Sequence, residues 1–427
     1  MTFLGLLVVA ATVFLLIRRV EVRLVLFVSG MVMASLAGKP LLIVDTFGKA
    51  MVAGVVAPIC SAMGFAAVLT ASGCDRQLVV ALTRLLHGTG PWLAPASILV
   101  AYFCNLAIPS QAGTAAALGP VLVPLLRAAG LTPAQAGAAL VLGASFGGEL
   151  LNPAAQDVLA VGATTHDGSG PITALIVPSS IAGAFATAAA YWFFTARRLQ
   201  HEPEPPKRLP VNWVRAFMPL FPVTVLLLSF AKVPGLVWLA TPPQDPAYAN
   251  VALGLPVVRA MLLGTGLVCA LCWKQLQAIS KEFFEGMGRA YASVISLTIT
   301  AQCFGAGLTA IGLTESLLAL VGSDRTLGVL LAIVFPGTLA MLSGSGSGPV
   351  LAFAQSLLPH LDDSHQPVRI ATIACHSGSF GRTLSPVSAV VIYVAGLVHV
   401  DPRELLRHVL KPLLVGALVS FVGALIF

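Results

Sequence analysis

Two polar breaks inside otherwise apolar sequence constrain this chain more than any other feature. The first is the run 108–114, which reads IPSQAGT, and the second is the alternating serine–glycine run Ser343–Gly348. Each break is followed by a second polar turn, which ends at Pro153 in one case and at Pro386 in the other. The interval from the first serine of the break to this proline is 43 positions in both copies. A duplicated apolar segment interrupted by glycine, serine and proline is typical of the binding site of a secondary transporter.

The composition indicates that most of the surface does not meet water. Of the 427 residues, 57% are hydrophobic and 10% are charged, whereas about a quarter of a soluble domain is charged. Several apolar runs approach the roughly 20 residues that cross a bilayer as a helix, and their continuity favours helices over a barrel. These runs are 1–17, 24–37, 171–194, 219–240, 257–273 and 412–427. We therefore predict an all-α polytopic membrane protein with roughly ten to twelve transmembrane helices.

Basic residues predict which loops face the cytoplasm. Arg18, Arg19 and Arg23 follow the first apolar run, which is the reverse of a signal peptide and predicts a retained helix with its N-terminus outside. Further basic clusters lie within 197–215, 274–289 and 403–411, and they alternate with apolar runs as inner loops should. Membrane topology thus explains the net charge of +7, and we expect no nucleic-acid partner.

The sequence gives little support to metal, redox or enzymatic chemistry. Most of the seven cysteines lie within apolar runs, and the C-x-x-C formed by Cys269 and Cys272 is surrounded by membrane-like sequence. A packing role is favoured for these thiols. There is no zinc-like histidine spacing, phosphate-binding Gly-Lys-Ser or nucleophile elbow. We expect no enzyme activity, no metal and no cofactor other than a coupling Na⁺ or H⁺.

A hydrophilic linker divides the chain into two predicted repeats. Residues 197–215 are rich in proline and charge, so they favour extended chain and separate an N-terminal repeat, 1–196, from a C-terminal repeat, 216–427. With a cytoplasmic linker and both termini outside, each half crosses the membrane an odd number of times. The two repeats are therefore predicted to have inverted topology.

Each repeat is predicted to contain a re-entrant hairpin followed by a broken helix. The hairpins lie near 93–126 and 327–358, and the broken helices lie near 134–165 and 368–398. Unwound backbone at membrane depth leaves polar groups unpaired, which is tolerated where they meet protein, water or a ligand. Helix N-termini at such breaks attract anions, and freed carbonyl groups can coordinate cations.

The hydroxyl, amide and guanidinium groups of the breaks and turns are the candidate substrate contacts. They are Ser110, Gln111, Thr114, Asn152, Ser343, Ser345, Ser347, Ser379, Arg382 and Ser385. Arg382 is a cation within apolar sequence, and its guanidinium can bind a carboxylate through two parallel hydrogen bonds. Close helix packing is the alternative explanation for the small residues.

Glu149 and His376 are the candidates for ion coupling. Glu149 can take up a coupling proton or help to bind a cation, and the alternative is a structural salt bridge with Arg382 or Asp157. His376 can titrate near neutral pH, although a lone histidine also serves as an ordinary packing residue. The residues leave both H⁺ and Na⁺ open as the coupling ion.

At these positions the chain resembles the anaerobic C4-dicarboxylate carrier (DcuC-type) family of the ion-transporter superfamily. The resemblance rests on 63–66 (MGFA), 73–75 (GCD), 285–288 (EGMG), 343–348 and 381–386. It implies a carrier for succinate, fumarate or malate in a bacterial inner membrane, with two hairpins that meet at the substrate. It further implies elevator-type movement and a homodimeric scaffold. Related carriers have Ser-Asn-Thr at each hairpin tip, and this chain departs from that signature, so ion ligation does not carry over.

Other transport modes and substrates fit parts of the same pattern. The same fold can carry short-chain monocarboxylates or amino acids, and transport can proceed by symport or by exchange. A passive channel is a further alternative, but two different polar breaks suit alternating access better. An intramembrane enzyme is disfavoured because no nucleophile–base pair or metal cluster is evident in the sequence.

Overall fold

The computed structural model describes residues 2–18, 20–86, 89–108, 110–165, 167–196, 210–241, 254–316, 325–361 and 366–427. All regular elements in these ranges are helices. Six are long and apolar enough to cross a membrane, and the pair α3–α4, bent by 49°, makes a seventh span if counted as one. Five further apolar helices have 10–17 residues. The all-α polytopic membrane fold is confirmed, although breaks shorten several of the apolar runs expected to span.

The helices before the linker form one continuous series. They are α1 (Thr2–Ile17), α2 (Val22–Leu36), α3 (Leu41–Met51), α4 (Val56–Ser72), α5 (Cys74–Thr83), α6 (Leu93–Ala107), α7 (Gln111–Ala128), α8 (Pro133–Ser145), the short helix η3 (Gly148–Leu151), α9 (Gln156–Thr164) and α10 (Ser169–Tyr191).

The second half begins with short helices and ends with the longest one. The helices are α11 (Trp213–Phe217), α12 (Phe221–Phe230), α13 (Val237–Ala240), α14 (Leu255–Leu271), α15 (Leu276–Ala290), α16 (Ser296–Ala310), α18 (Arg325–Ser343), α19 (Ser347–Ser356), α20 (Pro367–Thr383), α21 (Ala389–Val398) and α22 (Pro402–Ile426). Of the predicted linker, 197–209 lies outside the described residues, and α11 begins within its last part.

Both halves contain a hairpin followed by a helix that is interrupted at the polar turn. In the first half, α6 and α7 pack on α8, and the chain then turns through η3 into α9. In the second half, α18 and α19 pack on α20, and the chain turns into α21. The order of elements is thus repeated. The inversion of one repeat relative to the other stays a prediction.

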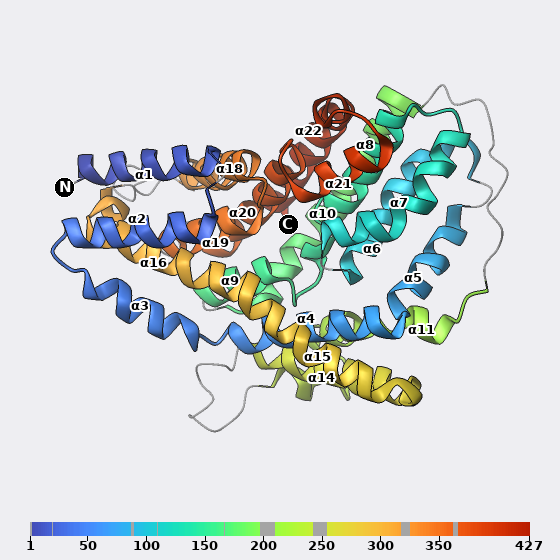
Figure 1. The fold of residues 1–427 in the computed structure, drawn as a ribbon, viewed down its shortest axis with the longest axis horizontal. Helices are drawn as coiled ribbons and strands as arrows, with labels where there is room; N and C mark the ends of the chain where they lie inside the picture. The colour runs from blue at the N-terminus through green and yellow to red at the C-terminus, as the bar shows by residue number, and fades with distance from the viewer. Residues whose placement is uncertain are drawn as a thin grey trace.

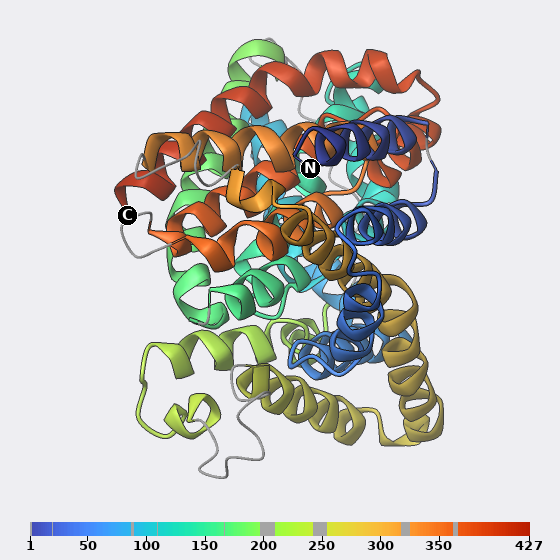
Figure 2. The ribbon, with the colours of Figure 1, turned by 90° about the vertical axis from the view of Figure 1, so that its left-hand side faces the viewer.

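Two large hydrophobic cores divide most of the helices into two bodies. The hairpin body contains α6–α10 and α18–α22, and the scaffold body contains α2–α4 and α12–α16. In Figure 1, α3, α4, α14 and α15 run along the lower side, and α20–α22 lie above them. Figure 2 shows α14 and α15 below the hairpin body from a second direction. The boundary between these bodies is where the candidate site lies.

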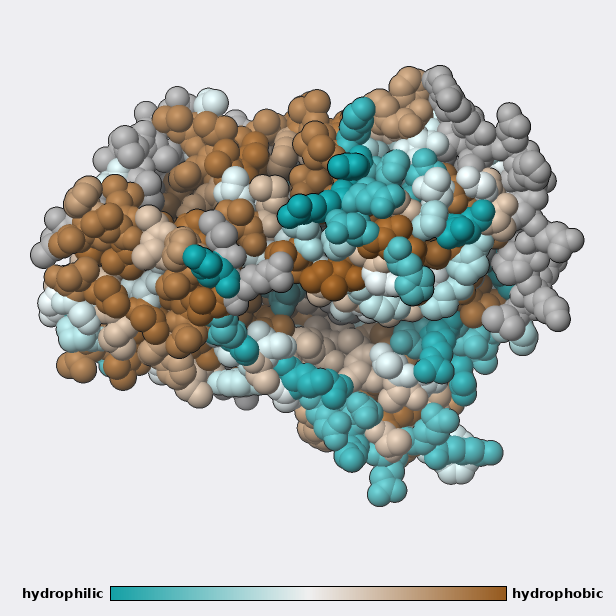
Figure 3. All heavy atoms as spheres, turned by 45° about the horizontal axis from the view of Figure 1, so that its top comes forward, coloured by the Kyte–Doolittle hydropathy of each residue, from teal (hydrophilic) through white to brown (hydrophobic). Residues whose placement is uncertain are grey.

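Large apolar side chains remain exposed over much of the surface. Examples are Phe3, Leu330, Leu418 and Ile426, each more than half exposed. Figure 3 shows these apolar residues in brown over a wide area, and polar residues gather in a narrower region. Monomeric soluble proteins rarely expose apolar patches of this extent. The surface therefore fits a chain surrounded by lipid.

Candidate functional site

The two predicted breaks are connected through one buried ion pair. Arg382 Nη2 lies 2.7 Å from Glu149 Oε1, and both side chains are less than a tenth exposed. The same carboxylate oxygen accepts a 2.6 Å hydrogen bond from Gln111 Nε2, at the first break. At the second break, a β-carbon on Gly346 would lie 3.0 Å from Arg382 Nη1, so the backbone of the serine–glycine run lies against the guanidinium. We call these three side chains the Gln111–Glu149–Arg382 bridge.

The acid and the base of this bridge occupy equivalent positions in the two repeats. Glu149 stands four residues before Pro153, and Arg382 stands four residues before Pro386. Of the alternatives that the sequence left for Glu149, the salt bridge with Arg382 is the one present here. Removing one partner of a buried ion pair costs about 3–5 kcal/mol, although an apolar replacement of both is often neutral. Stability alone therefore does not account for the pair.

The bridge leaves some of its hydrogen-bonding groups unused. Glu149 Oε2 and Arg382 Nε are buried without a hydrogen-bond partner among the described residues. The remaining contacts of Arg382 Nη2, to Ser145 O at 3.4 Å and to Ser379 Oγ at 3.5 Å, are long. Each unmet buried polar group costs about 1–3 kcal/mol. A polar ligand or a water molecule that reached the bridge would find donors and acceptors unoccupied.

Asn105 joins the first break to the polar turn that follows it. Its Oδ1 accepts from the backbone N–H of Glu149 at 3.1 Å. Its Nδ2 donates to Ile108 O at 3.1 Å and to Thr114 Oγ1 at 3.3 Å. The sequence analysis did not single out Asn105, because one amide in an apolar run is also typical of helix packing in membranes. Its position just before the break was the available signal.

Asn152 and Ser385 have matching structural roles in the two polar turns. Asn152 Oδ1 accepts from the backbone N–H of Ala154 at 2.9 Å, and Ser385 Oγ accepts from that of Val387 at 3.3 Å. Each oxygen thus caps the backbone immediately after its proline, as short polar side chains do in turns. In this structure the two oxygens are engaged by their own turns.

The serine–glycine run forms a tight turn between α18 and α19. Gly344 has φ +75°, and a β-carbon there would lie 2.9 Å from Val387 O, so the position requires glycine. Ser343 Oγ donates to Leu339 O at 2.7 Å and accepts from Ser345 N at 3.3 Å. Ser347 Oγ accepts from Gln156 Nε2 at 2.6 Å, which ties the second hairpin to the start of α9.

The remaining candidates lie at different distances from the bridge. Ser110 is exposed and caps α7 by accepting from Gly113 N at 3.1 Å. His376 is buried, and its ring nitrogens contact Ser179 Oγ and Thr372 O, so it faces α10 and its own helix. The bridge and the two hairpin tips are therefore brought together, whereas His376 contacts other partners.

A cavity of about 670 Å³ separates the hairpin body from the scaffold body at this point. The first break lines it through Ser110, Gln111 and Gly113, and α4 and α15 form the opposite wall. Cavities of this size accommodate small-molecule ligands. Gln111 is the member of the bridge that lines the cavity, and it connects the open space to Glu149 and Arg382.

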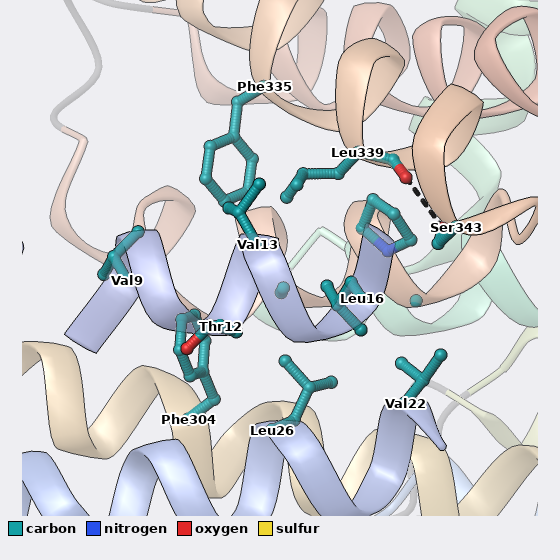
Figure 4. A pocket seen from close by; sticks show the side chains of 13 residues that line it. Val9, Thr12, Val13, Leu16, Val22, Leu26, Phe304, Phe335, Leu339 and Ser343 are labelled. Atoms are coloured by element: carbon teal, nitrogen blue, oxygen red, sulfur yellow. Dashed lines mark hydrogen bonds between the residues drawn. The ribbon is translucent and has the colours of Figure 1, made fainter. Parts of the chain in front are cut away.

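A second pocket lies between α1, α2 and the second hairpin. Figure 4 shows Phe335 and Leu339 facing Val13 and Leu16, with the Ser343 hydroxyl bonded to Leu339 O. Its volume of about 30 Å³ is close to that of one water molecule, and its lining is almost wholly apolar. The space suited to a carboxylate is therefore the larger cavity beside Gln111.

Known proteins resemble this chain over most of its length. The anaerobic C4-dicarboxylate transporter DcuC of Escherichia coli (strain K12) is 28% identical over 370 residues, which cover 84% of this chain and 78% of that protein. The probable anaerobic C4-dicarboxylate transporter DcuC of Vibrio cholerae is 25% identical over 380 residues, with coverages of 85% and 80%.

A solved structure and a family model extend these comparisons. The YdaH transporter of Alcanivorax borkumensis, described as having an unusual topology, has a TM-score of 0.61 at 15% identity, over 90% of this chain and 86% of that one. This likeness shows a shared fold. The family described as DcuC, C4-dicarboxylate anaerobic carrier, matches residues 22–427. Because that match covers nearly the whole sequence, the chain belongs to the DcuC family of anaerobic C4-dicarboxylate carriers.

Proposed function

We propose that this multi-pass membrane transporter carries C4-dicarboxylates, such as succinate, fumarate and malate, across a bacterial inner membrane. The family supports the substrate class, and a buried arginine beside a substrate-sized cavity supports the chemistry. A guanidinium is suited to a carboxylate because its planar fork donates two parallel hydrogen bonds. The N-terminus of α7, at Ser110–Gly113, offers partial positive charge to the second carboxylate.

One observation carries the proposed mechanism: Glu149 accepts hydrogen bonds that a substrate carboxylate could accept. Gln111 and Arg382 donate to the same oxygen, at 2.6 and 2.7 Å. A substrate that enters from the cavity meets Gln111 first, displaces Glu149, and then takes over both donors. The unpartnered Arg382 Nε supplies a further donor for the incoming carboxylate.

Displacement of Glu149 links substrate binding to a cation. A dianion beside Arg382 adds negative charge at a buried site, which is costly unless it is compensated. Compensation comes from a proton on Glu149, from Na⁺, or from exchange against another dicarboxylate, and His376 is a second proton acceptor. Movement is of the elevator type, with the hairpin body carrying the substrate past a scaffold body that forms a homodimer.

Transport of labelled succinate into proteoliposomes tests the proposed function. We expect accumulation above the external concentration when a H⁺ or a Na⁺ gradient is imposed, which a passive channel cannot achieve. Fumarate and malate should compete with succinate, whereas butyrate and amino acids should not. Competition by butyrate or amino acids without competition by fumarate would favour the alternative substrates.

Substitution of Arg382 tests the proposed carboxylate contact. Arg382→Lys keeps the charge but loses the planar fork, and Arg382→Ala loses both, so both should bind succinate more weakly. Loss of a charge-assisted hydrogen bond costs about 1.5–3 kcal/mol, or about a tenfold to hundredfold rise in apparent KM. Because Arg382→Ala leaves Glu149 buried without its partner, the double variant with Glu149→Gln controls for folding. Unchanged affinity in the Lys and Ala variants would rule out the contact.

A further inference from the structure

Asp157 is a second buried carboxylate close to the bridge. It lies in the first turn of α9 and is 3% exposed. Its Oδ1 has no hydrogen-bond partner within the described part of the chain. Asp157 adjoins Ser347 of the second hairpin and interacts electrostatically with Arg382 and Glu149. The substrate contacts proposed above make no use of this side chain.

The buried charges around the bridge do not balance when both acids are ionised. Glu149 and Asp157 are two acids, and Arg382 is their one nearby base. Of the helices packed against α9, the sequences of α4, α10 and α19 contain no charged residue or histidine. A buried carboxylate without a counter-charge is costly, so a cation is expected to join it.

The other titratable groups of α20, which also packs against α9, have partners of their own or no positive charge. Arg369 donates to Ala424 O and Leu425 O at the end of α22. His376 contacts Ser179 and Thr372. The Cys375 thiol faces Asp157 and supplies no positive charge. Arg382 is thus the base of α20 that acts on Asp157, and its direct ion pair is with Glu149.

We propose that Asp157 is the proton-binding site that couples transport to a proton gradient, an inference that rests on the proposed function. The surroundings favour a proton over Na⁺, because two helix N-termini meet here. α9 begins at Gln156 and α19 begins at Ser347, and these side chains are hydrogen-bonded at 2.6 Å. Helix N-termini present N–H groups and partial positive charge, whereas Na⁺ is bound by carbonyl and carboxylate oxygens.

The position of Asp157 gives a proton access from the same space as the substrate. Gln156, its neighbour in sequence, lines the 670 Å³ cavity and bonds Ser347 of the second hairpin. A proton from water in the cavity adds to the free oxygen of Asp157 and forms one O–H bond as substrate binds. The same bond breaks when the site opens to the other side, and the proton leaves with the substrate.

The test compares coupled uptake with exchange in proteoliposomes that contain the full chain. Asp157→Asn has the size and neutrality of the protonated acid. It should retain exchange of labelled against unlabelled succinate, lose the acceleration of uptake by an inward proton gradient, and move one proton fewer per succinate. Asp157→Glu should retain the acceleration. Glu404→Gln, which removes an exposed carboxylate in the first turn of α22, is the matched control and should behave as the unmodified chain.

Three results would overturn the proposal. One is an Asp157→Asn variant that responds fully to the proton gradient. The second is uptake in the unmodified chain driven by Na⁺ and insensitive to a proton gradient. The third is acid–base titration of the purified chain without substrate in which the unmodified protein and Asp157→Asn bind equal numbers of protons. Failure of the unmodified chain to move succinate instead contradicts the proposed function, and the titration still tests the proton site.

Discussion

At the scale of single residues, buried amides and charges hold the two breaks in position. Asn105 is fully buried and uses both ends of its side chain, one for the backbone of Glu149 and one for the tip of the first hairpin. Its partners would stay buried without it. The cost of losing Asn105 therefore comes mainly from the polar groups left unpaired, rather than from lost apolar contact.

Replacement of Asn105 tests this role. Asn105→Ala should lower the free energy of unfolding by about 1–3 kcal/mol, because the N–H of Glu149 and the carbonyl of Ile108 lose a partner. A lower melting temperature of the purified protein in detergent is the measurement. Ser97→Ala on the same helix is the control, since the Ser97 hydroxyl is buried without a partner and should not be missed. Equal melting temperatures for the two variants would contradict the assignment.

Residue type decided which of these groups the sequence could reveal. Glu149 and Arg382 were predictable candidates because a charge in apolar sequence is rare and costly. The sequence named Asp157 as one alternative partner in a salt bridge, and its unpartnered oxygen depends on how α9 packs against the second hairpin. The role of Asn105 was not predictable, because an amide in a membrane helix also serves ordinary packing.

At the scale of helices, two glycines allow the broken helices to approach the hairpins closely. A β-carbon on Gly148 would lie 2.1 Å from Tyr102 O of α6, and one on Gly381 would lie 2.1 Å from Gly337 O of α18. Each glycine immediately precedes a charged residue of the bridge, Glu149 or Arg382. Small residues permit such backbone contact between membrane helices. The same device thus positions the acid in one repeat and the base in the other.

A methyl group at either glycine should therefore disturb the bridge. Gly148→Ala and Gly381→Ala should each destabilise the protein by about 1–3 kcal/mol, since backbone must move to admit the new atom, and should slow succinate transport. Gly266→Ala in α14 is the matched control, because nothing lies within 4 Å of the added carbon there. It should melt at the same temperature or higher, as alanine favours helix. Normal transport and melting in the Gly148 and Gly381 variants would argue against close packing.

Helix positions and helix packing differ in how far the sequence could predict them. Apolar runs ended by glycine, serine and proline indicated where hairpins and broken helices occur. The packing partners of each helix were not predictable, because membrane helices are apolar on most faces and hydropathy does not distinguish lipid from protein. The contact of both breaks with one ion pair, and the position of α4 and α15 across the cavity, emerge from three-dimensional packing.

At the scale of the whole molecule, the separation into two cores suggests which parts move. The cavity lies between the bodies, with the first break on one wall and α4 on the other. Residues within one core are held by close packing, whereas the cavity leaves part of the boundary without contacts to break. Translation of the hairpin body against the scaffold body would carry the bridge across the membrane without disrupting either core.

Labelling of single cysteines distinguishes this movement from a symmetric rocking of both bodies. Ser110 at the first break and Thr70 on α4 are exposed and line opposite walls of the cavity. In a background with Cys269→Ser, which removes the native cysteine that is not fully buried, Ser110→Cys should react with a membrane-impermeant thiol reagent from both sides during turnover. Thr70→Cys should react from the cytoplasmic side alone, because an elevator moves the substrate site past a fixed scaffold. Reaction of both positions from both sides would favour rocking, and reaction of both from one side would show that the hairpin body stays in place.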